Sequence, residues 1–461
     1  MTNLFWIDLS YLAAAVFFIA GLKQLSAVKT ARQGNWISAL GMLLAAGITV
    51  YLPEVHNYLW IGIIALVGTL IGAVTAYRVR MTAMPQMVAL FNGFGGLASA
   101  LVAWAEWLQH GSVLHPFPFT ALVLGAFIGS VTFTGSMIAW GKLQGVVNQQ
   151  PVTYPLQKSL NLLLTLSILG AGYCLLQHPN LGSVLAYILI VSSVLGILLV
   201  LPIGGADMPV VISLLNSYSG LAAAMTGFIL MNKALIVSGA LVGTNGIFLT
   251  QIMCRAMNRS LTNVMFGGFG KIKKGAVGAA DTGYASVKSC SAEEAAMILE
   301  GAQSVILVPG YGLAVSRAQH ALKELAQILE SRGAVVKYAI HPVAGRMPGH
   351  MNVLLAEADV PYDKLYEMDQ INNEFEQTDV ALVVGANDVT NPAARNEPGS
   401  PIYGMPILNV DKARTSIVIK RSLSPGFAGI KNPLFESEKS ILLFQDAKAA
   451  LEGISKELKT L

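Results

Sequence analysis

A glycine-rich turn gives the clearest chemical signal in this chain. The motif G-Y-G-L-A-V begins at Gly310, directly after the apolar run Ser304–Pro309 and before a helical pattern. Between a strand and a helix, Gly310 would allow a tight turn, and Gly312 would let the backbone approach a pyrophosphate. The free amides of the helix N-terminus favour phosphate at the same place. The third glycine of the dinucleotide fingerprint is replaced by Val315. We therefore expect a dinucleotide to contact Gly310, Tyr311, Gly312 and Val315.

The type of nucleotide is predicted from the charges at two strand ends. An NAD site normally places an acid about 20 residues beyond the glycine motif, at the end of the second strand. Ile340 and His341 occupy that place here. Lys420, Arg421 and Ser422 stand at the end of the last predicted strand, where two cations and a hydroxyl can hold the 2′-phosphate of NADP. A solvated strand end is the alternative role for these three residues. The missing acid and the paired cations together favour NADP(H).

Two further polar clusters follow predicted strands. H-P-V-A-G-R-M-P-G-H begins at His341 and contains Arg346, and we expect both side chains to bind the nucleotide. G-A-N-D-V-T-N begins at Gly385, where a doubly wound sheet would have its topological switch point and its ligand crevice. Asp388 is the ionisable residue best placed for the nicotinamide end, and we predict it as the catalytic residue. A helix N-cap is the alternative role for Asp388, and the two roles are compatible.

Strand and helix patterns alternate around these clusters. Ser304–Pro309 is continuously apolar, as in a strand buried on both faces. Helical patterns cover 312–331 and 349–358. Repeated strand–helix–strand units indicate a doubly wound parallel sheet of the Rossmann-like kind, within the α/β class. The six predicted strands are 304–309, 335–341, 364–368, 379–385, 406–410 and 416–420.

Composition divides the chain into two domains. Of its 461 residues, 54% are hydrophobic and only 12% are charged, whereas soluble proteins carry about 25% charged residues. Long apolar runs fill 1–265, and charged residues return at ordinary frequency in 289–461. The stretch 266–288, rich in Gly, Lys and Ala, is predicted as a linker. The sequence has no basic stripe with interleaved aromatics, so we do not expect it to bind nucleic acid. The three cysteines lie far apart and predict neither a metal site nor a disulfide framework.

The N-terminal domain is predicted to be a polytopic α-helical membrane bundle. Each span needs about 20 mostly apolar residues. Lys and Arg concentrate in alternate links and after the last span, which predicts an outside N-terminus and a cytoplasmic nucleotide domain. We expect no cleavable signal peptide, because the first apolar segment carries Asp8 and lacks a basic leader. Glycines four residues apart indicate close helix packing in three spans, at Gly68 and Gly72, Gly125 and Gly129, and Gly239 and Gly243. The nine predicted spans are 4–22, 37–53, 57–77, 84–105, 119–140, 159–177, 182–201, 208–230 and 234–253.

Polar side chains inside the predicted spans need partners away from water. Asn92 and Asn216 lie within the fourth and eighth spans, and Ser136 lines the fifth. Interhelical hydrogen bonding is the simpler role for these residues, and a hydrated proton path is the functional one. No carboxylate lies in the middle of a span, so a proton relay here would use Asn, Ser, Thr and water. Asp207, at the cytoplasmic mouth of the eighth span, is the only acid placed to couple the bundle to the soluble domain.

Several long motifs resemble one family, the proton-translocating NAD(P) transhydrogenases, and within it the beta subunit. Four motifs resemble the NADP(H)-binding domain of this family: VPGYGLAV, IHPVAGRMPGHMNVLLAEA, VVGANDVTNPAA and IVIKRSLSPGFAGIKNPLF. Two further motifs, GGADMPVVISLLNSYSG and CRAMNRS, resemble the membrane domain of the family. The resemblance covers essentially the whole chain.

The resemblance implies a subunit of a two-subunit enzyme of the bacterial inner membrane. The partner alpha subunit would hold NAD(H), and hydride would pass directly between it and NADP(H) on this chain. Proton movement through the bundle would be coupled to that transfer, in a dimer of alpha–beta units. Carried over by motif, the nucleotide-binding residues are Gly310, Gly312, Val315, Arg346, Asp388, Lys420 and Arg421. The coupling residues are Asp207, Asn216 and Arg259, and 421–432 would form a lid over the nucleotide.

Two positions depart from the family pattern. Asn92 lies in a span that often carries a His in the family, and an Asn cannot titrate. This site can therefore only orient water, and the titrating group is left open, with the partner subunit as one place for it. Phe427 stands at a lid position that is often Tyr, which removes the hydroxyl contact there.

A second class of function competes with the transhydrogenase. A transporter or channel regulated by a cytoplasmic NADP(H)-sensing domain would share the same two-domain layout, with broken helices or a carbonyl filter in its bundle. A sensor binds NADP(H) without exchanging hydride, so redox turnover separates the two classes. A self-sufficient reductase is not expected, because the chain has one dinucleotide fingerprint and no flavin, haem or iron–sulfur motif.

Overall fold

The chain forms two compact units, which are described separately. One comprises Met1–Thr250 with Thr262–Gly270, and the other Gln251–Leu261 with Lys271–Leu461. The computed structural model describes residues 2–25, 30–52, 57–79, 81–110, 116–258, 260–261, 264, 284, 286–347, 349–400, 402–426 and 428–461.

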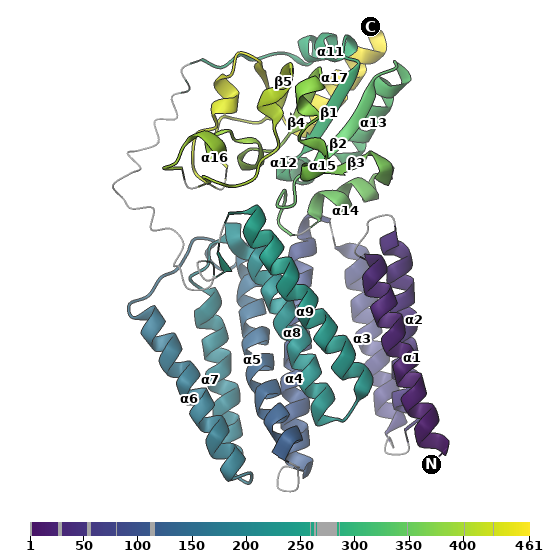
Figure 1. The fold of residues 1–461 in the computed structure, drawn as a ribbon, viewed down its shortest axis with the longest axis vertical. Coiled ribbons are helices and arrows are strands. Elements are labelled where there is room, and N and C mark those ends of the chain that lie inside the picture. Colours follow the sequence, from purple (N-terminus) through teal and green to yellow (C-terminus); the bar gives the residue numbers. More distant parts are fainter. Residues whose placement is uncertain are drawn as a thin grey trace. The chain divides into compact units, whose positions relative to one another are not determined.

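Long helices make up the first unit (Figure 1). Each of the nine predicted spans falls on a helix, and eight helices of the described residues are long and apolar enough to cross a membrane. The exception is α2, whose first turn contains Arg32 and Gln33. The count of nine spans therefore stays a prediction. The helices are α1 (Thr2–Leu25), α2 (Ala31–Val50), α3 (Tyr58–Arg78), α4 (Met84–His110), α5 (Pro116–Gln144), α6 (Gln157–Gln177), α7 (Gly182–Val200), α8 (Met208–Ile229) and α9 (Lys233–Ala256).

Small residues bring helix backbones into contact in the centre of this bundle. A Cβ on Gly129 of α5 would lie 2.6 Å from the carbonyl oxygen of Gly96 on α4. A Cβ on Gly239 of α9 would lie 2.8 Å from the carbonyl oxygen of Gly220 on α8. Neither Cβ would fit, so glycine is required for these approaches. The packing predicted for the α3 glycines is not seen, because a Cβ on Gly68 would meet no atom of the described chain within 4 Å.

A six-stranded parallel sheet organises the second unit. Its order is β3-β2-β1-β4-β5-β6, which is the doubly wound order of dinucleotide-binding folds. The switch point therefore lies between β1 and β4, which pair through Val305–Pro309 and Val380–Val384. The strands are β1 (Ser304–Pro309), β2 (Val335–Ile340), β3 (Leu365–Glu367), β4 (Val380–Val384), β5 (Thr415–Lys420) and β6 (Ser440–Phe444).

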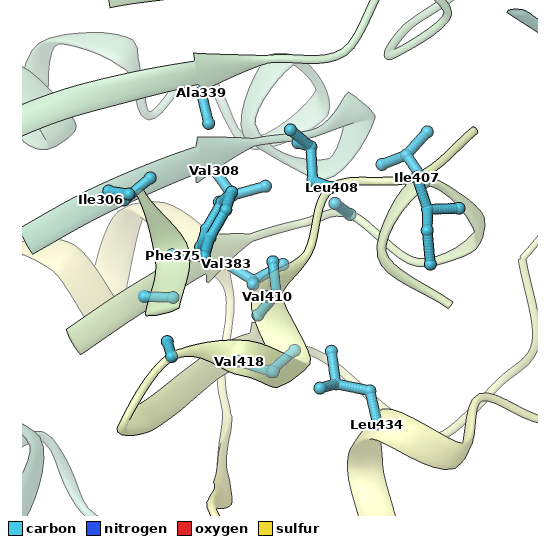
Figure 2. Close-up of a cluster of buried hydrophobic side chains, with 14 of the residues drawn as sticks. Ile306, Val308, Ala339, Phe375, Val383, Ile407, Leu408, Val410, Val418 and Leu434 are labelled. Carbon is cyan, nitrogen blue, oxygen red and sulfur yellow. The ribbon is translucent and has the colours of Figure 1, made fainter. Parts of the chain in front are cut away.

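An apolar cluster covers one face of the sheet (Figure 2). Ile306 and Val308 of β1 and Val383 of β4 contribute from the sheet, and Phe375 and Leu434 pack over them. The helices α13 (Gln319–Ser331) and α17 (Ala447–Thr460) pack against β2 and β5 and against each other. The carboxyl ends of β1, β4 and β5 are thereby held in fixed register, which fixes the loops that follow them.

Three predicted elements of this domain are corrected by the structure. Residues 406–410 form no strand, and the sixth strand is β6. The backbone of 406–410 bonds elsewhere, since the Ile407 carbonyl accepts from the Asn372 side chain and the Leu408 N–H donates to the Val389 carbonyl. Lys420 consequently ends the fifth strand rather than the last. The predicted helix 312–331 is divided into α12 (Tyr311–Ser316) and α13, with a residue between them at a left-handed φ of 50°.

The end of the predicted linker belongs to the second unit, which contains the parallel sheet. Ser289 forms a parallel bridge with Leu442 of β6, beside the predicted linker. The Leu442 N–H donates to the Lys288 carbonyl at 2.8 Å, and the Cys290 N–H donates to the Leu442 carbonyl at 2.9 Å. The chain therefore enters this domain along the open edge of β6. Residues 265–283 and 285 of the linker region lie outside the described residues.

Candidate functional site

The glycine turn crosses the loop after β4 at the switch point. The Gly310 N–H donates to the Val384 carbonyl, and the Gly312 N–H donates to the Gly385 carbonyl, both at 2.9 Å. A Cβ on Gly312 would lie 2.6 Å from the Cα of Gly385, and Gly385 has a left-handed φ of +67°. The glycines therefore let two loops touch through their backbones, in addition to leaving space for a ligand. Val315 is 46% exposed on α12 and takes no part in this crossing.

Tyr311 and Arg346 come together beside this turn, as expected for residues of one site. The Arg346 guanidinium lies over the Tyr311 ring, 4.6 Å from its centroid. The His350 ring meets Tyr311 edge-on, with centroids 6.1 Å apart. The Arg346 N–H donates to Nδ1 of His350 at 3.0 Å, so Nε2 of His350 carries the proton and is a donor. Burial, followed by the charge of Arg346, lowers the pKa of His350 to about 4.

His341 is placed differently from the expectation of a nucleotide contact. Its ring is 1% exposed, and both ring nitrogens are engaged within the chain. Nδ1 accepts the Val343 N–H at 3.2 Å, so Nε2 is the protonated nitrogen and donates to the Pro406 carbonyl at 2.9 Å. Burial lowers the pKa of His341 to about 4, although the bond to Pro406 acts in the opposite direction. The geometry gives the ring a structural task, which is to fix the end of β2 against 406–410.

The cations at the end of β5 lie where the sequence places a phosphate site. The ammonium of Lys420 donates to the Ser424 carbonyl at 2.9 Å and lies 4.7 Å from the centroid of the Phe435 ring. Burial lowers the pKa of Lys420 to about 8, and the nearby charge of Asp388 raises it. The guanidinium of Arg421 is 60% exposed. Ser422 is exposed as well, and its hydroxyl donates to that of Ser424 at 2.9 Å.

Arg421 also forms an ion pair that the sequence did not indicate. Its guanidinium lies 3.2 Å from Oδ2 of Asp446, the N-cap of α17. The Ser316 hydroxyl, at the end of α12, donates to the same oxygen at 3.1 Å. Asp446 therefore links the predicted phosphate clamp to the helix that follows the glycine turn. No motif points to this residue, because its role arises from contacts across 130 residues of chain.

The segment after β5 folds onto the loop after β4. Asp388 accepts the Ala428 N–H on Oδ2 at 3.0 Å. It begins a short 3-10 helix, Asp388–Thr390, whose N-cap is Asn387, so the alternative role as N-cap does not apply to Asp388. The Asn432 side chain donates to both the carbonyl and Oδ1 of Asn387, at 3.2 and 3.1 Å. The predicted lid 421–432 is thus bonded to the predicted catalytic loop. Phe427 lies outside the described residues.

These groups fit a nucleotide rather than a closed polar core. In the described part of the chain, Nε2 of His350 and Nδ2 of Asn387 are buried donors without a protein partner. A buried donor left unpaired is costly, and a phosphate or carboxamide oxygen would satisfy it. His350 begins α14 (His350–Glu357), after the loop that follows β2, and Asn387 lies in the loop after β4. The glycine turn and two cations likewise lie at or directly after the carboxyl ends of strands. The residues present therefore fit a phosphorylated dinucleotide.

In the helical unit, two of the predicted polar residues lie where α4 meets its neighbours α8 and α5. The buried side chain of Asn92 on α4 donates to the Ile212 carbonyl of α8 at 3.2 Å. Ile212 lies one turn before the partly buried Asn216 on the same helix. Ser136 of α5 packs against Gly93, and its hydroxyl is buried without a partner among the residues described. Polar groups from α4, α5 and α8 thus occupy the centre of the bundle.

Asp207 and its neighbours form the connection between α7 and α8. Asp207 is 4% exposed and precedes α8, yet its carboxylate makes no capping hydrogen bond to that helix. The fully buried ammonium of Lys142, which the sequence reading missed, donates to the carbonyls of Leu201 at 2.5 Å and Ile203 at 2.7 Å. It therefore fixes the backbone that leads to Asp207. Arg259, the predicted partner in coupling, lies outside the described residues.

Fold and site together define a membrane protein whose helical bundle is joined to a dinucleotide-binding α/β domain. Residues 7–457 match the family NAD(P) transhydrogenase beta subunit. The NAD(P) transhydrogenase subunit beta of Rhodospirillum rubrum is 50% identical over 454 residues, which are 96% of this chain and 97% of that one. A second relative of the same name, from a defined strain of that species, matches to the same extent. The chain belongs to the NAD(P) transhydrogenase beta-subunit family.

Membership in this family settles the class of function. The chain is a subunit of an NAD(P) transhydrogenase, an enzyme of nicotinamide nucleotides, and a beta subunit implies an alpha subunit. The competing class, a transporter or channel with a nucleotide sensor, is not the family that matches.

Proposed function

We propose that this subunit binds NADP(H) on its α/β domain and exchanges hydride directly with NAD(H) held by the alpha subunit. Hydride exchange would be coupled to proton movement through the helical bundle. The observation that carries the choice of NADP(H) is the pair Lys420 and Arg421 at the carboxyl end of β5. It is supported by β2, which ends at Ile340 without an acid and is followed by the internally bonded ring of His341.

The proposed binding residues act on different parts of the nucleotide. Lys420 and Arg421 would hold the 2′-phosphate, with Ser422 as a further donor. The turn at Gly310 and Gly312, with Tyr311 and Arg346 beside it, would hold the pyrophosphate region. In this assignment Val315, although part of the glycine motif, lies at the border of the nucleotide site. His341 stabilises the protein backbone beside the site and does not bind the nucleotide itself.

Asp388 is the proposed residue at the nicotinamide end. NADP(H), when bound, supplies or accepts the hydride. The chain would position the nicotinamide end through Asp388, whose carboxylate accepts the Ala428 N–H of the proposed lid. Exclusion of water protects the hydride path and strengthens the electrostatic interactions within the site.

Proton coupling is assigned to the bundle and to its connection with α8. We propose that Asn92, Ser136 and Asn216 orient water at the α4–α5–α8 contact, since none of these groups titrates. Asp207 would carry the charge that couples this path to the nucleotide domain, with Arg259 as its partner. The absence of a capping bond from Asp207 to α8 supports a role other than helix capping.

The location and assembly of the enzyme are proposed on the same basis. Lys and Arg in alternate links support a multi-pass protein of the bacterial inner membrane, with an outside N-terminus and a cytoplasmic nucleotide domain. One dinucleotide fingerprint in the chain supports an alpha subunit that holds NAD(H), within a dimer of alpha–beta units. The proposed domains are 1–265 in the membrane, 266–288 as linker and 289–461 for the nucleotide.

Reconstitution tests the proposal directly. The purified subunit should bind NADPH but transfer no hydride to NAD until the alpha subunit is added. In proteoliposomes containing both subunits, hydride exchange should be accompanied by a pH change reported by an enclosed dye. Hydride transfer by this subunit alone, or exchange that moves no protons, would contradict the corresponding part of the proposal.

A further inference from the structure

The register of the last two strands brings a carboxylate to the predicted phosphate clamp. β5 and β6 pair in parallel as far as Lys420 and Phe444, and the Gln445 N–H donates to the Lys420 carbonyl at 3.0 Å. Arg421 and Asp446 are the next residues of the two chain segments, so they leave the same edge of the sheet side by side. Nη2 of Arg421 lies 3.2 Å from Oδ2 of Asp446. The ion pair therefore follows from the pairing of the sheet.

The two partners of this ion pair differ in how firmly they are held. Oδ1 of Asp446 accepts the Lys448 N–H at 3.1 Å, as the N-cap of α17, and Oδ2 accepts the Ser316 hydroxyl at 3.1 Å. The carboxylate is thus fixed by a hydrogen bond to each oxygen. The side chain of Arg421 is long and 60% exposed, so its guanidinium can turn to another partner when one exposed ion pair is broken. When a ligand arrives, Arg421 is the partner that moves.

The ion pair occupies an atom that a phosphate would use. A guanidinium binds a phosphate most firmly as a fork, with two parallel N–H bonds. A fork made by the two terminal nitrogens of Arg421 includes Nη2, which is the atom next to Asp446. A carboxylate that only oriented the guanidinium would leave both terminal nitrogens to the ligand. Asp446 and a 2′-phosphate therefore need the same part of Arg421.

We propose that Asp446 is a positioning residue that competes with the 2′-phosphate of NADP(H) for Arg421 and thereby limits the affinity of the site. The proposal rests on the proposed function, because it needs the 2′-phosphate at Lys420 and Arg421. Without the 2′-phosphate, Arg421 stays paired with Asp446. When NADP(H) binds, the guanidinium leaves Asp446, and the broken ion pair reduces the net gain. One exposed ion pair corresponds to a factor of roughly twofold to fivefold in Kd.

A double-mutant cycle on the purified full-length subunit tests the competition. Asp446→Asn removes the charge and keeps a side-chain oxygen that can cap α17. Fluorescence titration should give a Kd for NADPH that is roughly twofold to fivefold lower than in the wild type, and an unchanged Kd for NADH. In the Arg421→Met background, which has no guanidinium, the same substitution should leave the Kd for NADPH unchanged. A purely structural role of Asp446 would not depend on Arg421.

Two further variants control for folding and for charge. Asp446→Ser also lacks the charge and can cap α17, so it should reproduce Asp446→Asn and keeps the test valid if one of the two variants fails to fold. Glu452→Gln removes one charge from the same helix, where Glu452 pairs with Lys448 at 3.7 Å. It should leave the Kd for both nucleotides at the wild-type value.

Three results would overturn the competition. An unchanged Kd for NADPH in Asp446→Asn and Asp446→Ser would show that Arg421 is not withheld from the phosphate. Weaker NADPH binding would show that Asp446 orients Arg421 for the phosphate. Equal tightening in the Arg421→Met background would show simple repulsion between carboxylate and phosphate. If Arg421→Met by itself binds NADPH like the wild type, the phosphate clamp of the proposed function fails, and the competition fails with it.

Discussion

The pH dependence of NADPH binding should report the charge of Lys420. Burial lowers the pKa of this ammonium to about 8, so it loses its proton within an accessible pH range. With that pKa, the side chain is roughly 90% charged at pH 7 and roughly 10% charged at pH 9. The 2′-phosphate, with a pKa near 6, stays doubly ionised throughout this range. Affinity that depends on the charged ammonium should therefore be complete below pH 7 and fall as pH rises through about 8.

The expected loss is about tenfold in Kd between pH 7 and pH 9, which matches the loss of the charged fraction. The two histidines near the site do not titrate in this range, because His341 and His350, with pKa values of about 4, are neutral throughout. NADPH fluorescence titrations at constant ionic strength would measure Kd, with NADH as the ligand that lacks the 2′-phosphate.

Two variants separate this reasoning from a general effect of pH on the fold. Lys420→Arg stays charged to above pH 12, so its Kd should be flat between pH 7 and 9. Lys420→Met should bind NADPH more weakly by roughly 1.5–3 kcal/mol at pH 7 and should also give a flat profile. A flat wild-type profile, or a tenfold loss that persists in Lys420→Arg, would refute the assignment of the ammonium to the phosphate.

Three further predictions concern the loops and the bundle. Asp207→Asn and Asp207→Ala should both bind NADPH normally and lose about a hundredfold in proton-coupled turnover, within the contribution of a positioned proton-transfer group. Normal pumping by Asp207→Asn would show that coupling does not need the charge of Asp207. Lys142→Met should destabilise the detergent-solubilised protein by roughly 1–3 kcal/mol per carbonyl left unpaired, measured by thermal unfolding, and an unchanged Tm would show that these bonds contribute nothing. Gly385→Ala should cost about 1–2 kcal/mol from its left-handed φ alone and more from overlap with Gly312, with weaker NADPH binding. Gly301→Ala, whose Cβ meets no atom within 4 Å in the described structure, should be nearly neutral in the same assays.

The parts of the fold set by local pattern could be predicted from the sequence. β1, the turn at Gly310 and the start of α12 follow one another within a few residues. The apolar run predicts the strand, the glycines predict the turn, and the helical pattern that follows predicts the helix. The apolar residues Ile407, Leu408 and Val410 predict a strand at 406–410, and they are buried in the structure, as strand residues would be. Burial alone does not identify a strand, since the partners of the backbone decide it. Those partners, such as the Asn372 side chain, come from distant parts of the chain.

The roles of single polar residues were harder to predict. His341 has the position and type of a ligand-binding residue, and only its two hydrogen bonds show that the ring is engaged within the chain. Asp446 and Lys142 have no motif around them. Arg421, which pairs with Asp446, lies 25 residues away in the chain. The carbonyls that bind Lys142, those of Leu201 and Ile203, lie about 60 residues away. Sequence reading finds residues whose neighbours in the chain share their task. It misses residues whose task is set by tertiary contacts.

The contacts of the proposed lid, 421–432, explain why the part of the site that must open and close is the hardest part to predict from the sequence. A lid must open, so it cannot be held by a large apolar face, whose burial would make opening too costly. Here the proposed lid is held by hydrogen bonds from Ala428 to Asp388 and from Asn432 to Asn387 and Tyr284. Only partly buried apolar side chains, those of Leu423, Ala428 and Ile430, add contacts with the apolar cluster. Each such bond contributes only about 0.5–1.5 kcal/mol, so a small displacement of one partner can shift the balance between open and closed. Hydrogen bonds of this kind leave no periodic pattern along the chain, whereas the rigid sheet beneath them does.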